Sequence, residues 1–215
     1  MLEQKLIEGR ILDLPFAGWE IFQGAPVNGF DEAAPIVRHV DVSASTGFFG
    51  PRASTTSVGA HAKERRNFIW LPWRKGLVSE VRPNGGDVLT GPMSGCMILR
   101  YTKNGEQYTG HVGTDSLSPA NTAQAKAAWN NFAATAPAGS ATGFNPAEYW
   151  TGHAPAPTKL AFGFKIFALV TGTGDFYSVF TWALRDKNNQ AVMGTQVQVA
   201  AVRREPNTLP QNGQI

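Results

Sequence analysis

The dipeptide Asn104-Gly105 constrains the local fold of this chain most strongly, because it lies between two stretches of strand-forming residues. Both residue types tolerate positive φ, so Asn-Gly favours a two-residue type I′ turn between antiparallel strands. The sequence therefore predicts a β-hairpin of residues 96–102 and 106–112. With the turn at this position, Lys103 pairs with Glu106 and the rest of the register follows.

This register brings the only cysteine of the chain, Cys96, close to a histidine. Ile98 lies opposite His111 and Cys96 opposite Gly113, so all four share one face of the hairpin. Cys96 and His111 become diagonal neighbours, with their Cβ atoms roughly 7 Å apart or somewhat less. A single thiol cannot form an intrachain disulfide, so Cys96 is either a core residue or a nucleophile.

A Cys-His pair has a defined chemistry. The imidazole accepts the thiol proton, the thiolate attacks, and the imidazolium later protonates the leaving group. The backbone N–H of Cys96 is a candidate oxyanion donor, and Gly95 keeps side-chain bulk away from a substrate. The alternative is structural, because free cysteine is often buried as a small hydrophobe.

The other histidines are weaker candidates. His39 lies on the polar face of a predicted strand over 36–42, and His61 lies in a predicted loop over 43–62. His153, in the Pro- and Gly-rich stretch 136–158, is the rival catalytic base. With one cysteine and four scattered histidines, the sequence predicts no metal site.

The residues around Cys96 resemble those of the Cys-His bacterial glutamine deamidase toxins, the family of cytotoxic necrotizing factor and Burkholderia lethal factor. Met93-Ser94-Gly95-Cys96 is similar to the Leu-Ser-Gly-Cys signature of this family, with Met93 in place of leucine. His111 follows Cys96 by 15 residues, a separation that the family also shows. The upstream segment Ile69-Trp70-Leu71-Pro72-Trp73 and Thr90, six residues before Cys96, match further family positions.

The resemblance implies a protein-glutamine deamidase, a toxin or virulence effector that hydrolyses a glutamine side chain of a target protein to glutamate. It implies Cys96 as nucleophile, His111 as acid and base, and Thr90 as the residue that orients His111, with no cofactor. The partner that the resemblance suggests is a host protein, either a GTPase or a translation factor, with no nucleic acid or membrane required. The implied enzyme is a monomer acting in the host cytosol.

Length and composition predict one catalytic domain over residues 1–215, with residues 1–10 and 204–215 peripheral. The 23 glycines and 14 prolines suit a sheet-rich chain with many turns. The net charge of +3 is a mild excess of scattered Lys and Arg, which indicates a solvated surface. The sequence predicts no signal peptide and no membrane helix, so export would follow a non-classical route.

The predicted fold class is α+β, a mixed or antiparallel β-sandwich with flanking helices, as the resemblance to the deamidase toxins also implies. Trp70 and Trp73 are expected in the core rather than at the site. Ser116 or Ser118 is expected to cap a helix over 119–135. The other expected elements are short helices over 1–9 and 146–150, an irregular segment over 14–34, and strands over 67–71, 160–171, 175–185 and 190–203.

Two other classes of function stay open. A transglutaminase or cysteine protease uses the same thioester chemistry, although papain-like enzymes separate cysteine and histidine by on the order of a hundred residues. A β-rich binding module with Cys96 in its core is the non-enzymatic alternative. Accessibility of the Cys96 thiol distinguishes the enzymes, which need an exposed nucleophile, from the binding module, which buries the residue.

Overall fold

The computed structural model describes residues 2–14, 19–43, 64–157, 161–184, 196–207, 209 and 213–215. It is mostly β, with 46% of residues in strands and 9% in helix, which confirms the β-rich α+β class. The elements are β1 (Ile11–Asp13), β2 (Phe30–Glu32), β3 (Val37–Ser43), β4 (Glu64–Leu71), β5 (Val78–Val81), β6 (Val88–Met93), β7 (Met97–Lys103), β8 (Glu106–Val112), α1 (Pro119–Ala133), β9 (Ala141–Phe144), β10 (Ala161–Val170), β11 (Phe176–Leu184) and β12 (Gln196–Glu205).

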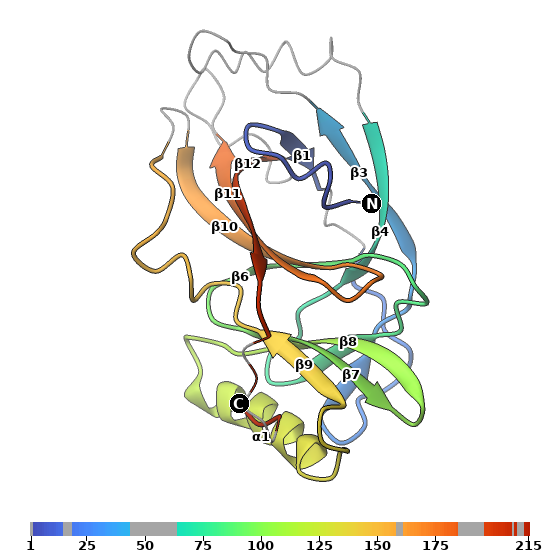
Figure 1. Cartoon of the computed structure of the whole chain (residues 1–215). Helices are drawn as coiled ribbons and strands as arrows, with labels where there is room; N and C mark the ends of the chain where they lie inside the picture. The colour runs from blue at the N-terminus through green and yellow to red at the C-terminus, as the bar shows by residue number, and fades with distance from the viewer. Residues whose placement is uncertain are drawn as a thin grey trace, which may run out of the picture.

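Two sheets make up the molecule. The strands β1-β12-β11-β10-β6-β4-β3 close into a barrel, and β2-β5-β8-β7-β9 form a five-stranded sheet. Figure 1 shows the barrel at one end and the sheet at the other, with α1 on the far side of the sheet. One of the two layers of the expected sandwich is therefore a closed barrel instead of an open sheet. β1 pairs with both β12 and β3, and this pairing closes the barrel.

Alternation along the barrel strands divides the core into layers. Phe68 and Trp70 of β4 point into the barrel, whereas Ile69 and Leu71 point toward the five-stranded sheet. A layer of apolar side chains between the barrel wall and the sheet results, and it includes Cys96. A third cluster joins the other face of the sheet to α1.

The chain passes repeatedly between the two sheets, so no single cut separates them. Strands β1, β3, β4 and β6 of the barrel alternate along the sequence with β2 and β5 of the sheet, and β10 to β12 return to the barrel. Within the described part of the chain, no helix is long and apolar enough to cross a membrane.

The predicted hairpin is confirmed in its register. Asn104 and Gly105 have φ of 53° and 80°, the positive values that a type I′ turn requires. Lys103 pairs with Glu106, and Ile98 pairs with His111. Strand β7 begins at Met97, so Cys96 lies at the entry to the strand rather than in the ladder.

The helix and the C-terminal strands are also confirmed. The side chain of Ser118 caps α1 by accepting a hydrogen bond from the backbone N–H of Asn121 (3.4 Å). Strands β10, β11 and β12 follow the three expected stretches; residues 185–195 and the loop 44–63, including His61, lie outside the described residues. Within the described residues, α1 is the only helix, so the expected flanking helices reduce to one.

Several local expectations were wrong. Residues 2–10 form turns instead of a helix, and Leu2 and Leu6 are both buried in the core cluster inside the barrel. The segment 146–150 is also a turn. Strands β2 and β9 fall in stretches expected to be irregular, and they are too short to show a period of two. The ends of the chain are not merely peripheral, since Leu209 and Ile215 pack against the cluster under α1.

We expect Trp129→Ala to lower the free energy of unfolding by about 3–5 kcal/mol. Trp129 is fully buried, lies edge-on to Tyr101 with ring centroids 5.0 Å apart, and donates its indole N–H to the carbonyl oxygen of Gly213 (2.8 Å). Urea denaturation measures the change. The matched control is Leu117→Ala, expected within about 0.5 kcal/mol of wild type because Leu117 is 93% exposed. Equal losses in both variants would contradict the assigned core.

Candidate active site

The three predicted site residues lie where the barrel meets the five-stranded sheet. Thr90 comes from β6 of the barrel wall, and His111 comes from β8 of the sheet. Cys96 lies between β6 and β7, on the connection from the barrel to the sheet. Thr90 points toward the sheet because its neighbour Leu89 points into the barrel.

A hydrogen bond joins Thr90 to His111. Thr90 Oγ1 and His111 Nδ1 are 2.7 Å apart, and both side chains are fully buried. When the ring N–H at Nδ1 donates to the hydroxyl, Nε2 carries the lone pair and is the basic atom. Nε2 is buried and has no hydrogen-bond partner. Burial lowers the pKa of His111 to about 3, which keeps the ring neutral at physiological pH.

The thiol of Cys96 makes its hydrogen bonds with Thr114, not with His111. The Thr114 hydroxyl donates to Cys96 Sγ (3.3 Å), and Sγ lies 3.8 Å from the carbonyl oxygen of Thr114. The side chain is 4% exposed, and burial raises the pKa of the thiol, an effect that the hydrogen bonds from Thr114 partly offset. Cys96 thus lies covered in the apolar layer between the barrel and the sheet, and its raised pKa favours the thiol over the thiolate.

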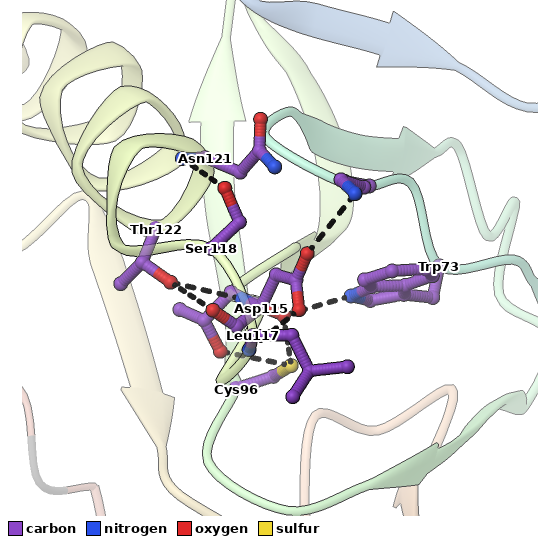
Figure 2. Close-up of polar contacts among 9 residues, drawn as sticks. Trp73, Cys96, Asp115, Leu117, Ser118, Asn121 and Thr122 are labelled. Carbon is purple, nitrogen blue, oxygen red and sulfur yellow. Dashed lines mark hydrogen bonds and ion pairs between the residues drawn. The ribbon is translucent and has the colours of Figure 1, made fainter.

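Trp73 lies over Thr114, in the loop that follows β8, contrary to the expectation that this tryptophan packs in the core. Its side chain is 37% exposed, and its indole N–H donates to the carbonyl oxygen of Thr114 (3.2 Å). Figure 2 shows Trp73 approaching the loop beside Cys96. Trp70, by contrast, is buried inside the barrel as predicted. Proline ends β4 between the two tryptophans, and this break turns Trp73 out of the alternating pattern.

A network of polar contacts fixes the loop that follows His111. Asp115 accepts a hydrogen bond at Oδ1 from the backbone N–H of Leu117 (2.9 Å) and forms an ion pair at Oδ2 with Lys75 (3.3 Å). The hydroxyl of Thr122 both accepts from the backbone N–H of Asp115 and donates to its carbonyl oxygen. These bonds hold the loop between β8 and the capped end of α1, as Figure 2 shows.

Two further polar residues lie in the same row of the sheet as His111. Ser79 of β5 is paired with His111, and Asp31 of β2 is paired with Ser79. Both side chains are almost fully buried, Ser79 Oγ has no hydrogen-bond partner, and Asp31 forms an ion pair with Arg74 (3.3 Å). Burial raises the pKa of Asp31. No sequence signal marks these residues, because only the pairing of three strands brings them together.

The other described histidines lie away from this row. His39 is exposed and its Nδ1 is 2.6 Å from Asn67 Oδ1, in agreement with its predicted surface position. His153 is exposed and stacks on Tyr149 with ring centroids 4.7 Å apart. Among the residues that the structure describes, no group of three or more His, Cys, Asp and Glu side chains is arranged to hold a metal ion.

A scan against protein-family models, a search of curated proteins and a search of solved structures each found no match. The resemblance to the deamidase toxins therefore rests on the sequence motif around Cys96.

Burial of His111 makes stability depend on pH. The native ring, with a pKa of about 3, stays neutral while the unfolded ring, near 6.5, gains a proton as the pH falls. The contribution of His111 to the free energy of unfolding is therefore fully present above about pH 6.5. It declines as the pH falls toward 3, by about 1.4 kcal/mol per pH unit at most. Between pH 7 and pH 5 we expect His111 to account for a loss of about 2 kcal/mol. Urea denaturation of wild type and His111→Asn at both pH values measures it, and equal losses in the two proteins would contradict the buried neutral ring.

The cover over Cys96 predicts slow alkylation. We expect iodoacetamide at pH 7.5 to modify Cys96 roughly tenfold or more slowly than free cysteine, because burial raises the pKa of the thiol. Trp73→Ala removes the side chain over Thr114 and should accelerate the reaction. The matched control Trp19→Ala removes a tryptophan that contacts Phe68 and Trp70, and should leave the rate unchanged. Modification of the wild type at the rate of free cysteine would refute the covered thiol.

Proposed function

We propose that this protein is a protein-glutamine deamidase of the Cys-His type, a bacterial toxin or effector that converts a glutamine of a host protein to glutamate. The observation that carries the proposal is the hydrogen bond between Thr90 Oγ1 and His111 Nδ1, with Nε2 left without a partner. Thr90 is the residue that the resemblance names for orienting the histidine. The orienting contact leaves Nε2 without a hydrogen bond. Because the thiol is bonded to Thr114 and burial lowers the pKa of His111, transfer of the thiol proton to Nε2 requires the cover over Cys96 to move.

The first half of the reaction forms a thioester. His111 Nε2 takes the proton of the Cys96 thiol, and the sulfur forms a bond to the carbonyl carbon of the glutamine amide. The negative charge on the oxygen is stabilised by the backbone N–H of Cys96. The C–N bond then breaks as the imidazolium gives its proton to the departing nitrogen, and ammonia leaves.

The second half releases glutamate. His111 Nε2 takes a proton from a water molecule, and the water oxygen bonds to the thioester carbon. The C–S bond breaks, the sulfur regains the proton from the imidazolium, and a carboxylic acid remains that ionises in water. Thr90 holds the ring in one orientation through both halves. Each proton that the imidazole accepts is returned, so the cycle needs no cofactor.

Access to the thiol requires a movement of its cover. Cys96 is 4% exposed, whereas Ser94 and Gly95 directly before it are exposed. A target glutamine therefore approaches over Gly95 and displaces the contacts that Trp73 and Thr114 make. Burial until the substrate arrives protects the thiol from oxidation and raises the strength of each electrostatic contact within the site.

A non-enzymatic binding module is the second candidate, and the burial of Cys96 favours it. In this function Cys96 belongs only to the apolar layer between barrel and sheet, and the bond between Thr90 and His111 serves to satisfy a buried polar pair. A transglutaminase would share the thioester and differ in the acceptor that resolves it. One experiment distinguishes the three functions.

The test is peptide mass spectrometry of a host-cell lysate treated with the wild-type protein or with Cys96→Ser. We expect a gain of about one mass unit at a particular glutamine in the wild-type sample only, since an amide becomes a carboxylate. His111→Asn should slow this change by about 10²- to 10⁴-fold. Thr90→Val should slow it more than Thr90→Ser, which keeps the hydroxyl.

The matched control is His153→Asn, which changes the exposed rival histidine and should keep full activity. Loss of activity in His153→Asn with retention in His111→Asn would overturn the assigned base. A cross-link that depends on Cys96 would instead indicate a transglutaminase. Identical wild-type and Cys96→Ser samples, together with a Cys96 that resists alkylation in the Trp73→Ala protein, would refute the deamidase and favour the binding module.

A further inference from the structure

Three polar groups on one face of the five-stranded sheet have no hydrogen-bond partner among the described residues. They are the hydroxyls of Ser79 and Thr109 and the ring nitrogen Nε2 of His111. Each side chain is at most 1% exposed. Val81, the partner of Thr109, belongs to the apolar layer between the sheet and the barrel. Ile98, the partner of His111, belongs to the same layer, so all three polar side chains face it.

The strand register places these three side chains at the corners of a small triangle. Ser79 of β5 lies directly opposite His111 of β8, a pairing that sets Cβ atoms about 5 Å apart. Thr109 lies two residues before His111 on the same face, about 7 Å along the strand. Thr109 and Ser79 are diagonal neighbours, with Cβ atoms roughly 7 Å apart. One small molecule inside this triangle can reach a polar atom of all three side chains.

The chemistry of the three corners selects a neutral occupant. Hydroxyls both donate and accept hydrogen bonds, and burial lowers the pKa of His111 to about 3, which leaves the ring uncharged at physiological pH. The nearest charge in the row is Asp31, the partner of Ser79 in β2, and Arg74 compensates it through an ion pair (3.3 Å). An ion would therefore find no opposite charge at the three corners. Water can donate two hydrogen bonds and accept two, so it matches a set of hydroxyls and a neutral imidazole.

We propose that this triangle is a binding site for one buried water molecule, which accepts a hydrogen bond from Ser79 Oγ and donates to His111 Nε2 and Thr109 Oγ1. Buried waters in proteins typically make about three hydrogen bonds, to polar groups that lack other partners. The inference does not depend on the proposed function, because a binding module would need the same water to satisfy its core. In a deamidase, this water leaves Nε2 when the cover over Cys96 moves and the nitrogen takes the thiol proton.

The test is oxygen-17 magnetic relaxation dispersion of the full chain, which counts the water molecules that stay bound for longer than the protein takes to tumble. Oxygen-17 follows the water molecule itself, so proton exchange with the hydroxyls of Ser79 and Thr109 does not contribute. We expect Ser79→Val to lose one such water relative to wild type, because valine fills the space and offers no donor. The matched control is Ser116→Val, which changes an exposed serine and should keep the wild-type count.

A second measurement locates the water in the wild type and does not depend on the folding of a variant. Water-selective NOE spectroscopy at neutral pH should show contacts from a bound water to the carbon-bound ring protons of His111 and to the β protons of Ser79. Absence of these contacts would overturn the site, as would equal counts of long-lived waters in wild type and a folded Ser79→Val. The outcome is separate from catalysis. A bound water without deamidation keeps the site and rejects the enzyme, and deamidation without the bound water does the reverse.

Discussion

The barrel and the five-stranded sheet are held together by one layer of buried side chains, and the candidate site exists only because that layer exists. Strands β4, β6 and β10 each present one face to the barrel interior and the other to this layer. Such two-sided burial explains why β6, β10 and the second half of β4 consist largely of apolar residues. Thr90 is an interruption in this pattern, a hydroxyl on the apolar outer wall of the barrel, and its partner is the imidazole of His111.

The polar groups within this layer carry a cost that the surrounding packing offsets. Ser79 Oγ, Thr109 Oγ1 and His111 Nε2 are buried without hydrogen-bond partners in one region of the sheet. Each such group disfavours the folded state relative to an apolar side chain of the same shape. Ser79 pairs directly with His111 and Thr109 lies two residues before it, so these unsatisfied groups lie close to one another in the sheet. The same burial lowers the pKa of His111 and couples the site to the stability of the fold.

Local signals in the sequence predicted the local parts of this structure. The Asn104-Gly105 turn sets the register of β7 and β8, and Ser118 with Pro119 sets the start of α1, because each depends on residues close in sequence. The contact between Thr90 and His111 was suggested only by the resemblance to a family, since 21 residues and two sheets separate the pair. Closure of the barrel and the row of Asp31, Ser79 and His111 depend on pairings between distant strands, which a period of two cannot specify. Trp73 was predicted in the core because tryptophan is usually buried. Pro72 instead ends β4 and redirects the chain, so that the Trp73 side chain is partly exposed.

The order in which the barrel acquires its strands bears on synthesis of the protein at the ribosome. Strand β6, which carries Thr90, pairs with β4 on one side and with β10 on the other. Closure further requires β12, which pairs with β1 across almost the whole chain. A nascent chain that already exposes Cys96 and His111 therefore lacks the strand that completes the wall behind Thr90. The site is assembled after translation of the C-terminal strands, so an incomplete chain has the residues of the site without its geometry.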